Sequence, residues 1–255
     1  MYDGVITEKP AMRLGAPPTL HRDHALFLDF DGTLVEIAAS PQLVQVPAKL
    51  PGLLGELADQ LEGAVAVVSG RPLAELTRML APFAGAMAGQ HGIERRRSDG
   101  STIRGATRPE LEQIRPEIAG FAARHDGVIL EDKGGSLALH YRQAPPLEAE
   151  CCTLLRRAAC ASGGALEAVP GKMVIELVPR SGGKGRAITE FLAEAPFHGR
   201  VPMFIGDDTT DEDGFAAVNR LGGISVRVGD GVTIARHYLT TVDDVLSWLA
   251  RGLAR

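Results

Sequence analysis

The chain has 255 residues, of which 45% are hydrophobic and 23% charged, and 32 acidic and 27 basic side chains give it a formal net charge of -5. A chain of this length buries roughly 70 to 75% of its unfolded surface, enough for one large domain or two small ones. Its 30 glycines and 16 prolines are too few for a low-complexity chain, which excludes wholesale disorder.

The predicted core begins with alternating strands and helices. An apolar strand is expected at 25–29, a helix at 50–63, a second strand at 64–68 and, after the turn at 69–72, a helix at 73–80. Such alternation implies right-handed crossovers and a parallel sheet, with functional groups at the carboxyl ends of its strands.

The pattern changes between about residues 101 and 175. Helices are expected near 109–124 and 146–161, and strands at 127–132, 136–142 and 173–177. The last two alternate apolar and polar residues, which indicates a sheet with one open face.

The α/β pattern then returns, with a helix at 185–194 and buried strands at 202–206 and 224–228. We therefore predict an α/β fold with a doubly wound parallel sheet in its core domain and an inserted α+β module. The expected boundaries are a tail at 1–22, a discontinuous core at 23–100 and 178–255, and the inserted module at 101–177.

The composition also bears on partners and location. The longest apolar runs have the length of a strand, so no membrane contact is expected, and the acidic balance without a basic stripe argues against nucleic acid. Residues 1–22 lack the apolar centre of a signal peptide and are expected to be flexible. Cys151, Cys152 and Cys160 cluster on one predicted helix, as in a reduced, cytoplasmic protein. A monomer is the working expectation.

Two carboxylates follow the first strand, in the string DFDGTL at 29–34. Because strand side chains two residues apart point the same way, Asp29 and Asp31 project together, and Gly32 lets the backbone turn away. Carboxylates this close stay ionised together only beside a cation, or else one of them carries a proton. Asp-Gly turns are common after strands, so the string alone is a weak signal.

A second acidic cluster, GDDTTDEDGF at 206–215, follows the strand at 202–206. Asp207 and Asp208 thereby reach another carboxyl end, and hard oxygen ligands from two adjacent strands suit octahedral Mg²⁺. Thr210 and Asp211 also fit a simpler interpretation, the N-terminal cap of a helix.

Two short segments have the residue types that bind phosphate. Ser69, Gly70 and Arg71 follow the strand at 64–68 and offer a hydroxyl and loop amides, and Lys184 offers a point charge at a helix start. Each signal is weak when taken singly.

The order of these four signals on a doubly wound sheet resembles the haloacid dehalogenase (HAD) superfamily of aspartyl-phosphate phosphohydrolases. The resemblance covers residues 24–235 and implies a Rossmann-like core, with the inserted α+β module as a cap domain between the second and third motifs. Further strings are similar to the trehalose-6-phosphate phosphatases of that superfamily: GQHG (89–92) with Glu94, KGGSLALHYR (133–142), PGKMVIEL (170–177) and GDDTTDEDGF. Phe30 departs from that family's usual Tyr.

The resemblance implies Mg²⁺-dependent hydrolysis of a small-molecule sugar phosphate, trehalose 6-phosphate, in the last step of trehalose biosynthesis. Asp29 is expected to be the nucleophile that forms an aspartyl-phosphate, and Asp31 the general acid and base. The expected metal ligands are Asp29, Asp31 (through its main-chain carbonyl), Asp207 and Asp208. The expected substrate-binding residues are Ser69, Gly70, Arg71, Gln90, His91, Glu94, Lys133, His140, Arg142, Lys172, Glu176 and Lys184.

Strand periodicity refines the expectations for the cap. Lys172 and Glu176 stand four residues apart on a predicted strand and so should share a face. Alternation puts His140 and Arg142 on one face and Tyr141 on the other, so at least one of these three is expected to be structural.

Three other functions stay open on the sequence. One is another HAD sugar-phosphate phosphatase, for sucrose phosphate or mannosyl-phosphoglycerate. A phospho-aspartyl receiver domain also combines clustered acids with a Ser or Thr and a Lys, but it needs about half this length and no cap. A phosphomutase shares the paired Asp residues and would require a bisphosphate.

Overall fold

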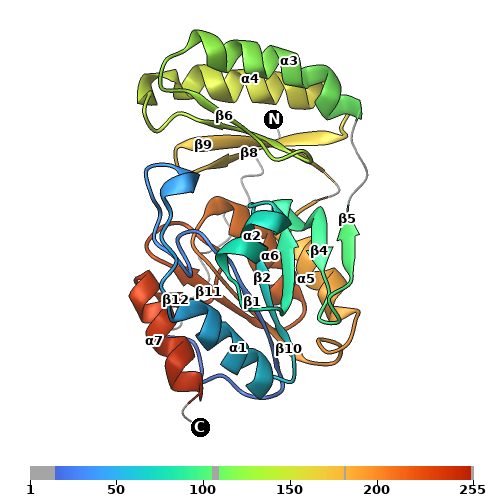
Figure 1. The fold of residues 1–255 in the computed structure, drawn as a ribbon, viewed down its shortest axis with the longest axis vertical. Helices are drawn as coiled ribbons and strands as arrows, with labels where there is room; N and C mark the ends of the chain where they lie inside the picture. Colours follow the sequence, from blue (N-terminus) through green and yellow to red (C-terminus); the bar gives the residue numbers. More distant parts are fainter. Residues whose placement is uncertain (1–14, 105–108, 181, 254–255) are drawn as a thin grey trace, which may run out of the picture.

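The computed structural model describes residues 15–104, 109–180 and 182–253, and it shows two units stacked along the long axis of the molecule (Figure 1). The lower unit is built on an eight-stranded sheet and the upper unit on a four-stranded sheet. We call them the core and the cap.

The core sheet has the strand order β12-β11-β10-β1-β2-β3-β4-β5. Strands from β12 to β3 pair in parallel, and β4 and β5 extend the sheet as an antiparallel edge. The strands are β1 (His24–Leu28), β2 (Val65–Val68), β3 (Ala86–Gly89), β4 (Glu94–Arg96), β5 (Thr102–Arg104), β10 (Val201–Gly206), β11 (Ile224–Val228) and β12 (His237–Leu239). The order reverses between β1 and β10, and such a switch point is where open α/β sheets bind ligands.

Helices cover this sheet on both faces. The core helices are α1 (Leu50–Gln60), α2 (Leu73–Met79), α5 (Lys184–Leu192), α6 (Glu212–Arg220) and α7 (Val242–Leu253). Helix α1 packs against α7, and α5 packs against α6. Right-handed crossovers that leave β1 and β10 in opposite directions place α1 and α6 on opposite faces. Strand β2 is therefore buried along its whole length, as an inner parallel strand should be.

The cap sheet is antiparallel, in the order β6-β7-β9-β8. Its elements are β6 (Ile129–Asp132), β7 (Leu137–His140), β8 (Leu166–Gly171), β9 (Val174–Pro179), α3 (Pro109–Arg124) and α4 (Glu148–Ala161). Both helices lie on the outer face of this sheet, so its other face looks toward the core (Figure 1). The sheet side chains that pack against these two helices, including Leu137, Leu139 and Tyr141, form a hydrophobic cluster separate from that of the core.

Four short helices occur in the loops: η1 (Pro41–Leu43), η2 (Gln90–Gly92), η3 (Pro145–Leu147) and η4 (Thr209–Asp211). Among the described residues, no helix combines the length and the apolar character needed to cross a bilayer.

The sequence prediction missed several short strands. Strand β4 has the sequence ERR, without an apolar run, and β12 is three residues long. Strand β8 contains Pro170, a residue that argues against a central strand but is tolerated at a sheet edge, where β8 lies. Helix α7 was also missed, although Val242, Val245 and Leu249 are buried with helical spacing.

The domain boundaries remain a proposal. The sequence placed the start of the cap at residue 101, whereas Thr102–Arg104 pair with β4 in the core sheet and β9 continues to Pro179. We therefore propose that the cap begins after Arg104 and ends after Pro179. Of the expected tail at 1–22, residues 1–14 lie outside the described residues, and Leu20 packs into the core cluster.

Candidate active site

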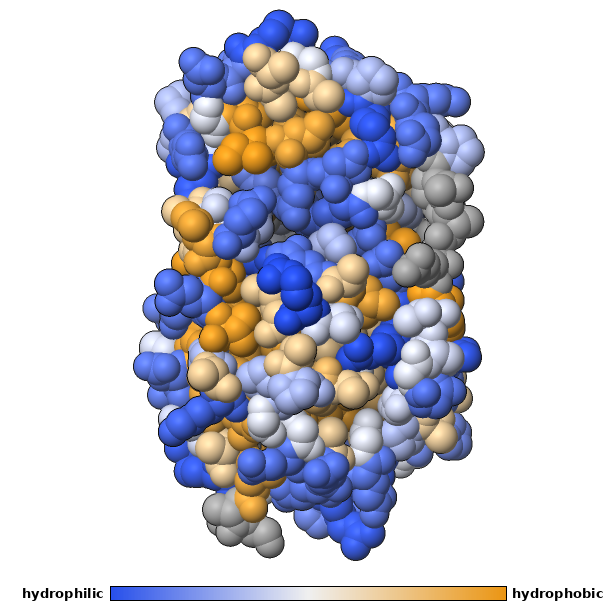
Figure 2. Space-filling view, viewed as in Figure 1, coloured by the Kyte–Doolittle hydropathy of each residue, from blue (hydrophilic) through white to orange (hydrophobic). Residues whose placement is uncertain are grey.

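A cavity of about 410 Å³ lies between the core and the cap. Asp29, Ser69 and Asp207 reach it from the ends of β1, β2 and β10, and Lys133, Arg142 and Glu176 line it from the cap. Hydrophilic side chains gather across the molecule at this level (Figure 2). The volume of the cavity falls within the roughly 300 to 1,000 Å³ typical of small-molecule sites.

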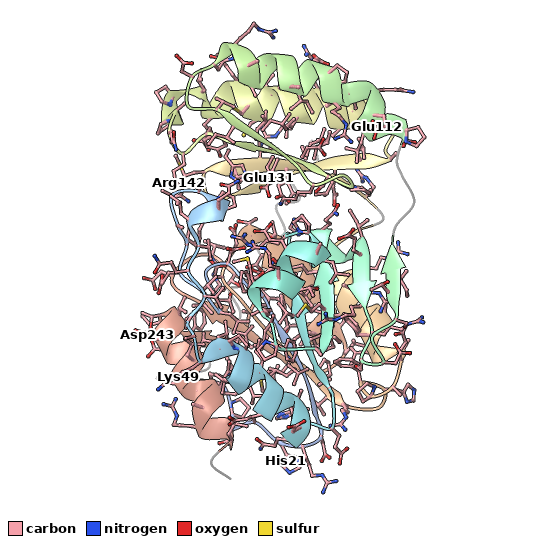
Figure 3. The ribbon with its side chains drawn as sticks, in the orientation of Figure 1. His21, Lys49, Glu112, Glu131, Arg142 and Asp243 are labelled. Carbon is pink, nitrogen blue, oxygen red and sulfur yellow. The ribbon has the colours of Figure 1, made fainter. Side chains whose placement is uncertain are left out.

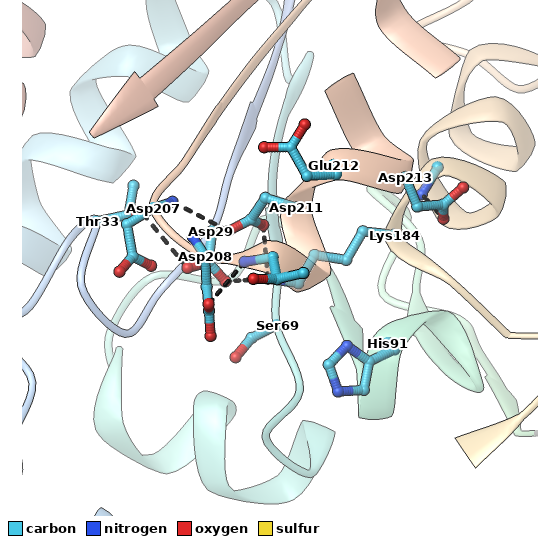
Figure 4. A network of polar contacts seen from close by, with 12 residues as sticks. Asp29, Thr33, Ser69, His91, Lys184, Asp207, Asp208, Asp211, Glu212 and Asp213 are labelled. Carbon is cyan, nitrogen blue, oxygen red and sulfur yellow. Dashed lines mark hydrogen bonds and ion pairs between the residues drawn. The ribbon is translucent and has the colours of Figure 1, made fainter. Parts of the chain in front are cut away.

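The deepest residues form a buried ionic cluster (Figure 4). The Lys184 Nζ atom donates to Asp29 Oδ1 and to Asp211 Oδ1, each at 2.7 Å. Thr33 Oγ1 donates to the other oxygen of Asp29 at 3.3 Å. Lys184 is 3% exposed, which is sustainable only because two carboxylates surround its charge.

The pKa values follow from this crowding. Burial and the neighbouring carboxylates of Asp211 and Asp207 raise the pKa of Asp29 above its usual value, and contact with Lys184 offsets part of the effect. Burial alone would lower the pKa of Lys184, but Asp211 and Asp29 together raise it above its usual value. The lysine is therefore a permanent cation at the base of the cavity.

Three carboxylates of this cluster could hold a metal ion. Asp29, Asp207 and Asp211 each offer an oxygen within 4.8 Å of the others. The Oδ1 atom of Asp207 is buried without a hydrogen-bond partner among the described residues. Gly32 has a φ of 82°, and a Cβ at this position would collide with the Asp207 carboxylate. The donor set and the free oxygen both fit a hard cation such as Mg²⁺.

Asp208 lies at the rim of this cluster. Its Oδ1 atom accepts from the Thr209 amide at 2.6 Å, while Asp211 Oδ2 accepts from the amides of Asp207 and Asp208. This reciprocal capping fixes the loop after β10, as the simpler sequence interpretation of Asp211 expected. The structure thus places Asp211, and not the Asp208 carboxylate, beside Asp29.

Asp31 faces Arg71. The guanidinium donates to both carboxylate oxygens, with Nε to Oδ2 at 2.7 Å and Nη2 to Oδ1 at 2.8 Å. Ser69 Oγ accepts from the Arg71 amide at 3.2 Å and lines the cavity. Gly70 lies against the next loop, since a Cβ there would lie 2.7 Å from His91 Nε2.

Glu176 of the cap pairs both with a second cap residue and with the core. The Glu176 carboxylate contacts His91 Nε2 of the core through one oxygen and Lys133 Nζ of the cap through the other. Burial alone would raise the pKa of Glu176, but Lys133 and His91 hold it well below its usual range. His91 has a φ of 54°, an uncommon conformation that turns its ring toward the cap.

Two expected substrate residues lie behind the wall of the cavity. The Gln90 side chain accepts from the Gly135 amide at 2.9 Å and so links core to cap. Glu94 accepts from the Leu73 amide at 2.9 Å, at the start of α2. Neither is among the described residues that line the cavity.

The remaining expected residues form the cap side of the cavity. His140 and Arg142 line it and Tyr141 is buried in the cap cluster, which confirms the predicted alternation. His140 Nε2 contacts Glu131 Oε2 at 2.8 Å. Figure 3 shows Glu131 and Arg142 at the level of the cap sheet.

Lys172 reaches the cavity by a different route from the predicted one. Gly171 pairs with Val174, so Lys172 and Met173 form a two-residue turn between β8 and β9. The positive φ of Met173, 63°, accompanies this turn. Lys172 therefore lies outside β9, and the prediction that it shares a strand face with Glu176 is wrong. From the turn, Lys172 Nζ contacts Asp207 Oδ2 of the core.

Comparison with known proteins identifies the family. A trehalose-phosphatase family model matches residues 27–239. The chain is 44% identical over 233 residues to trehalose-6-phosphate phosphatase of Escherichia coli (strain K12), which covers 91% of this chain and 87% of that one. The chain belongs to the trehalose-phosphatase family. It is also 43% identical over 208 residues to a probable trehalose-phosphate phosphatase of Sinorhizobium fredii, covering 82% of this chain and 78% of that one.

Solved structures agree with the fold of this trehalose-phosphatase family member. The C-terminal domain of C. albicans trehalose-6-phosphate phosphatase superimposes with a TM-score of 0.81 at 21% identity, covering 96% of this chain and 99% of that one. A haloacid dehalogenase-like hydrolase from Bacteroides thetaiotaomicron superimposes with a TM-score of 0.59 at 17% identity, over 89% of this chain and 98% of that one. The predicted HAD-type fold is confirmed.

Sequence reasoning missed three features of the site. Asp211 was expected to cap a helix and not to be a direct metal ligand. Glu131 carried a detectable signal, since it lies on the predicted strand at 127–132, two residues before Lys133. The residues 37–42 and Val44, which line the cavity from the segment that contains η1, carried none, because a mixture of small and apolar residues is typical of any loop.

Proposed function

We propose that the protein hydrolyses trehalose 6-phosphate to trehalose and inorganic phosphate, the last step of trehalose biosynthesis. The observation that carries the proposal is the meeting of Asp29, Lys184 and Asp207 at the base of a cavity whose opposite wall is polar cap surface. The trehalose-phosphatase family match supports the choice of sugar. The cytoplasmic location and the monomeric state expected from the sequence stay predictions.

The reaction proceeds in two displacements at phosphorus. Asp29 attacks, its oxygen forms a bond to phosphorus, and the bond from phosphorus to the sugar oxygen breaks with a proton from Asp31. Asp31 then takes a proton from the water that cleaves the aspartyl-phosphate. Ser69 and Lys184 hold the remaining phosphoryl oxygens, and Lys184 neutralises part of their charge.

Mg²⁺ belongs to the same proposal. Asp29 and Asp207 would hold it, with the Asp31 carbonyl as a further ligand by resemblance, and Asp211 is close enough to contribute. When bound, the ion offsets the repulsion between the anionic nucleophile and the anionic phosphate. Lys172 contacts Asp207 in the described structure, so this ammonium would have to share that carboxylate or leave it.

The cap supplies the contacts that select the sugar. Lys133, Glu176 and Arg142 present donors and acceptors to the cavity, as recognition of sugar hydroxyls requires. His140 and Glu131 form a second polar pair on the same wall.

The test is phosphate release from a panel of trehalose 6-phosphate, sucrose 6-phosphate, mannosyl-phosphoglycerate and glucose 6-phosphate, with Mg²⁺ and with excess EDTA. Trehalose 6-phosphate should be preferred, EDTA should remove activity, and Asp29→Asn should leave less than about a hundredth of it. A ten-fold preference for a monosaccharide phosphate, or full activity in EDTA, would overturn the proposal. A requirement for a catalytic bisphosphate would instead indicate a mutase.

A further inference from the structure

Every N–H group of the Arg71 guanidinium is engaged within the protein. Besides the two bonds to Asp31, Nη1 contacts the Glu75 carboxylate and lies 3.8 Å from Met79 Sδ, and Nη2 donates to the Pro41 carbonyl at 3.1 Å. The guanidinium carries five N–H groups, so these contacts use its donor capacity. A residue that binds substrate phosphate needs free donors directed into the cavity, and Arg71 has none to spare.

The surroundings hold this guanidinium in one place. Its side chain is 6% exposed, and its central carbon lies 5.5 Å from the centre of the Phe30 ring. Glu75 belongs to α2 and Pro41 to η1, so two separate elements of the core fix Arg71 independently of Asp31. A planar, always charged fork held in this way can orient a carboxylate through two parallel bonds.

The same geometry leaves Asp31 able to exchange a proton with a ligand. A carboxylate has about four lone-pair sites, and Arg71 occupies one site on each oxygen. The Asp31 side chain is 36% exposed and lines the cavity, so its other two sites are accessible to a ligand bound there. Without Arg71, the carboxylate would turn about its side-chain torsions and lose this orientation.

We propose that Arg71 is a positioning residue that orients the Asp31 carboxylate for proton transfer, rather than a ligand of the substrate phosphate. The inference rests on the proposed function, because it assigns proton transfer to Asp31. It replaces the role that the sequence suggested for Arg71. Glu75 and the Pro41 carbonyl contribute to the same positioning, since they hold the Arg71 guanidinium in place.

The first test compares two leaving groups. In Arg71→Lys, which keeps the charge but loses the fork, kcat/KM for trehalose 6-phosphate should fall about 10- to 100-fold, because a misoriented Asp31 loses part of the roughly 10²- to 10⁴-fold contribution of general acid-base catalysis. For p-nitrophenyl phosphate kcat/KM should change less than about two-fold, because kcat/KM covers steps only up to transfer of the phosphoryl group and p-nitrophenolate departs without a proton. Equal losses on both substrates, or no loss on either, would overturn the proposal.

The second test asks whether Arg71 acts through Asp31. In an Asp31→Asn background, adding Arg71→Lys should lower kcat/KM for trehalose 6-phosphate by less than about two-fold, because contacting residues that act as a unit are not additive. If the losses of the two single variants instead multiply in the double variant, Arg71 acts independently of Asp31 in sugar or phosphate binding. The constant for competitive inhibition by inorganic phosphate should stay within about two-fold of wild type, whereas loss of a phosphate ligand would weaken it about ten-fold or more.

Arg95→Lys is the matched control. Its side chain is also 6% exposed and paired with two carboxylates, Glu190 and Glu194, on the core. It should lower the melting temperature without changing the ratio of the two kcat/KM values. Wild-type activity on trehalose 6-phosphate is measured in the same series, so failure of the proposed function is seen separately from failure of this inference.

Discussion

Replacing Asp207 with Asn should stabilise the metal-free protein. Asp207 is 2% exposed, and its Oδ1 atom has no hydrogen-bond partner among the described residues. Burial and the neighbouring Asp211 carboxylate raise the pKa of Asp207 to about 6, and Lys172 offsets part of the effect. The charged form is therefore disfavoured in the fold, and an uncharged side chain of the same shape avoids that cost.

The sign and size of the effect follow from proton linkage. An unfolded Asp titrates near pH 4, so between about pH 4 and pH 6 the folded state binds the extra proton and stability falls as the pH rises. Above about pH 6 the full cost is present, and two pKa units correspond to about 3 kcal/mol. For a chain of this size that difference amounts to a shift of about 6 to 12 °C in melting temperature.

The assay is thermal unfolding of wild type and Asp207→Asn in EDTA and in Mg²⁺. At about pH 7.5 in EDTA the variant should melt at the higher temperature, and the difference should shrink toward zero near about pH 4. Saturating Mg²⁺ should raise the melting temperature of wild type but not of the variant. A variant that melts below wild type in EDTA at about pH 7.5, or a difference independent of pH, would refute the reasoning.

Three further predictions concern the two walls of the cavity. Gly32→Ala should abolish turnover and weaken Mg²⁺ binding in calorimetry, because its Cβ would collide with the Asp207 carboxylate; unchanged affinity would contradict this. Lys172→Ala should lower kcat/KM for trehalose 6-phosphate by a factor that corresponds to roughly 1 to 3 kcal/mol of lost interaction free energy and hardly change that for p-nitrophenyl phosphate, whereas equal damage would indicate a structural role. The depressed pKa of Glu176 adds stability above about pH 4, and this stability is lost as the pH falls further. Glu176→Gln should therefore melt at a lower temperature than wild type near neutral pH and lose less stability on acidification; melting temperatures that change with pH in parallel would exclude this.

Strand-end residues were predictable because parallel topology determines their position. Asp29, Ser69 and Asp207 follow strands of one parallel sheet, so alternation of strands and helices was enough to place them at one edge. That argument does not depend on how far apart the residues are in the sequence, so it could bring together residues separated by more than a hundred positions.

Side chains whose position depends on register or on partners were not predictable. Lys172 enters the cavity from a two-residue turn, and only the pairing of Gly171 with Val174 reveals that turn. Arg71 has a long side chain that could reach either the phosphate or Asp31, and the choice depends on Glu75 and on Pro41, whose proximity is a property of the folded core.

The hydrophobic interior of the molecule is divided in two. Among the described residues, the cluster around Phe27 in the core and the cluster around Leu139 in the cap share no member, and the contacts that Glu176 and Lys172 make across the cavity are polar. A substitution that repacks one interior therefore leaves the other undisturbed. Descendants of this chain can accordingly change the surface that meets the sugar while the residues that handle phosphate keep their places, so new substrates are accessible without rebuilding the chemistry.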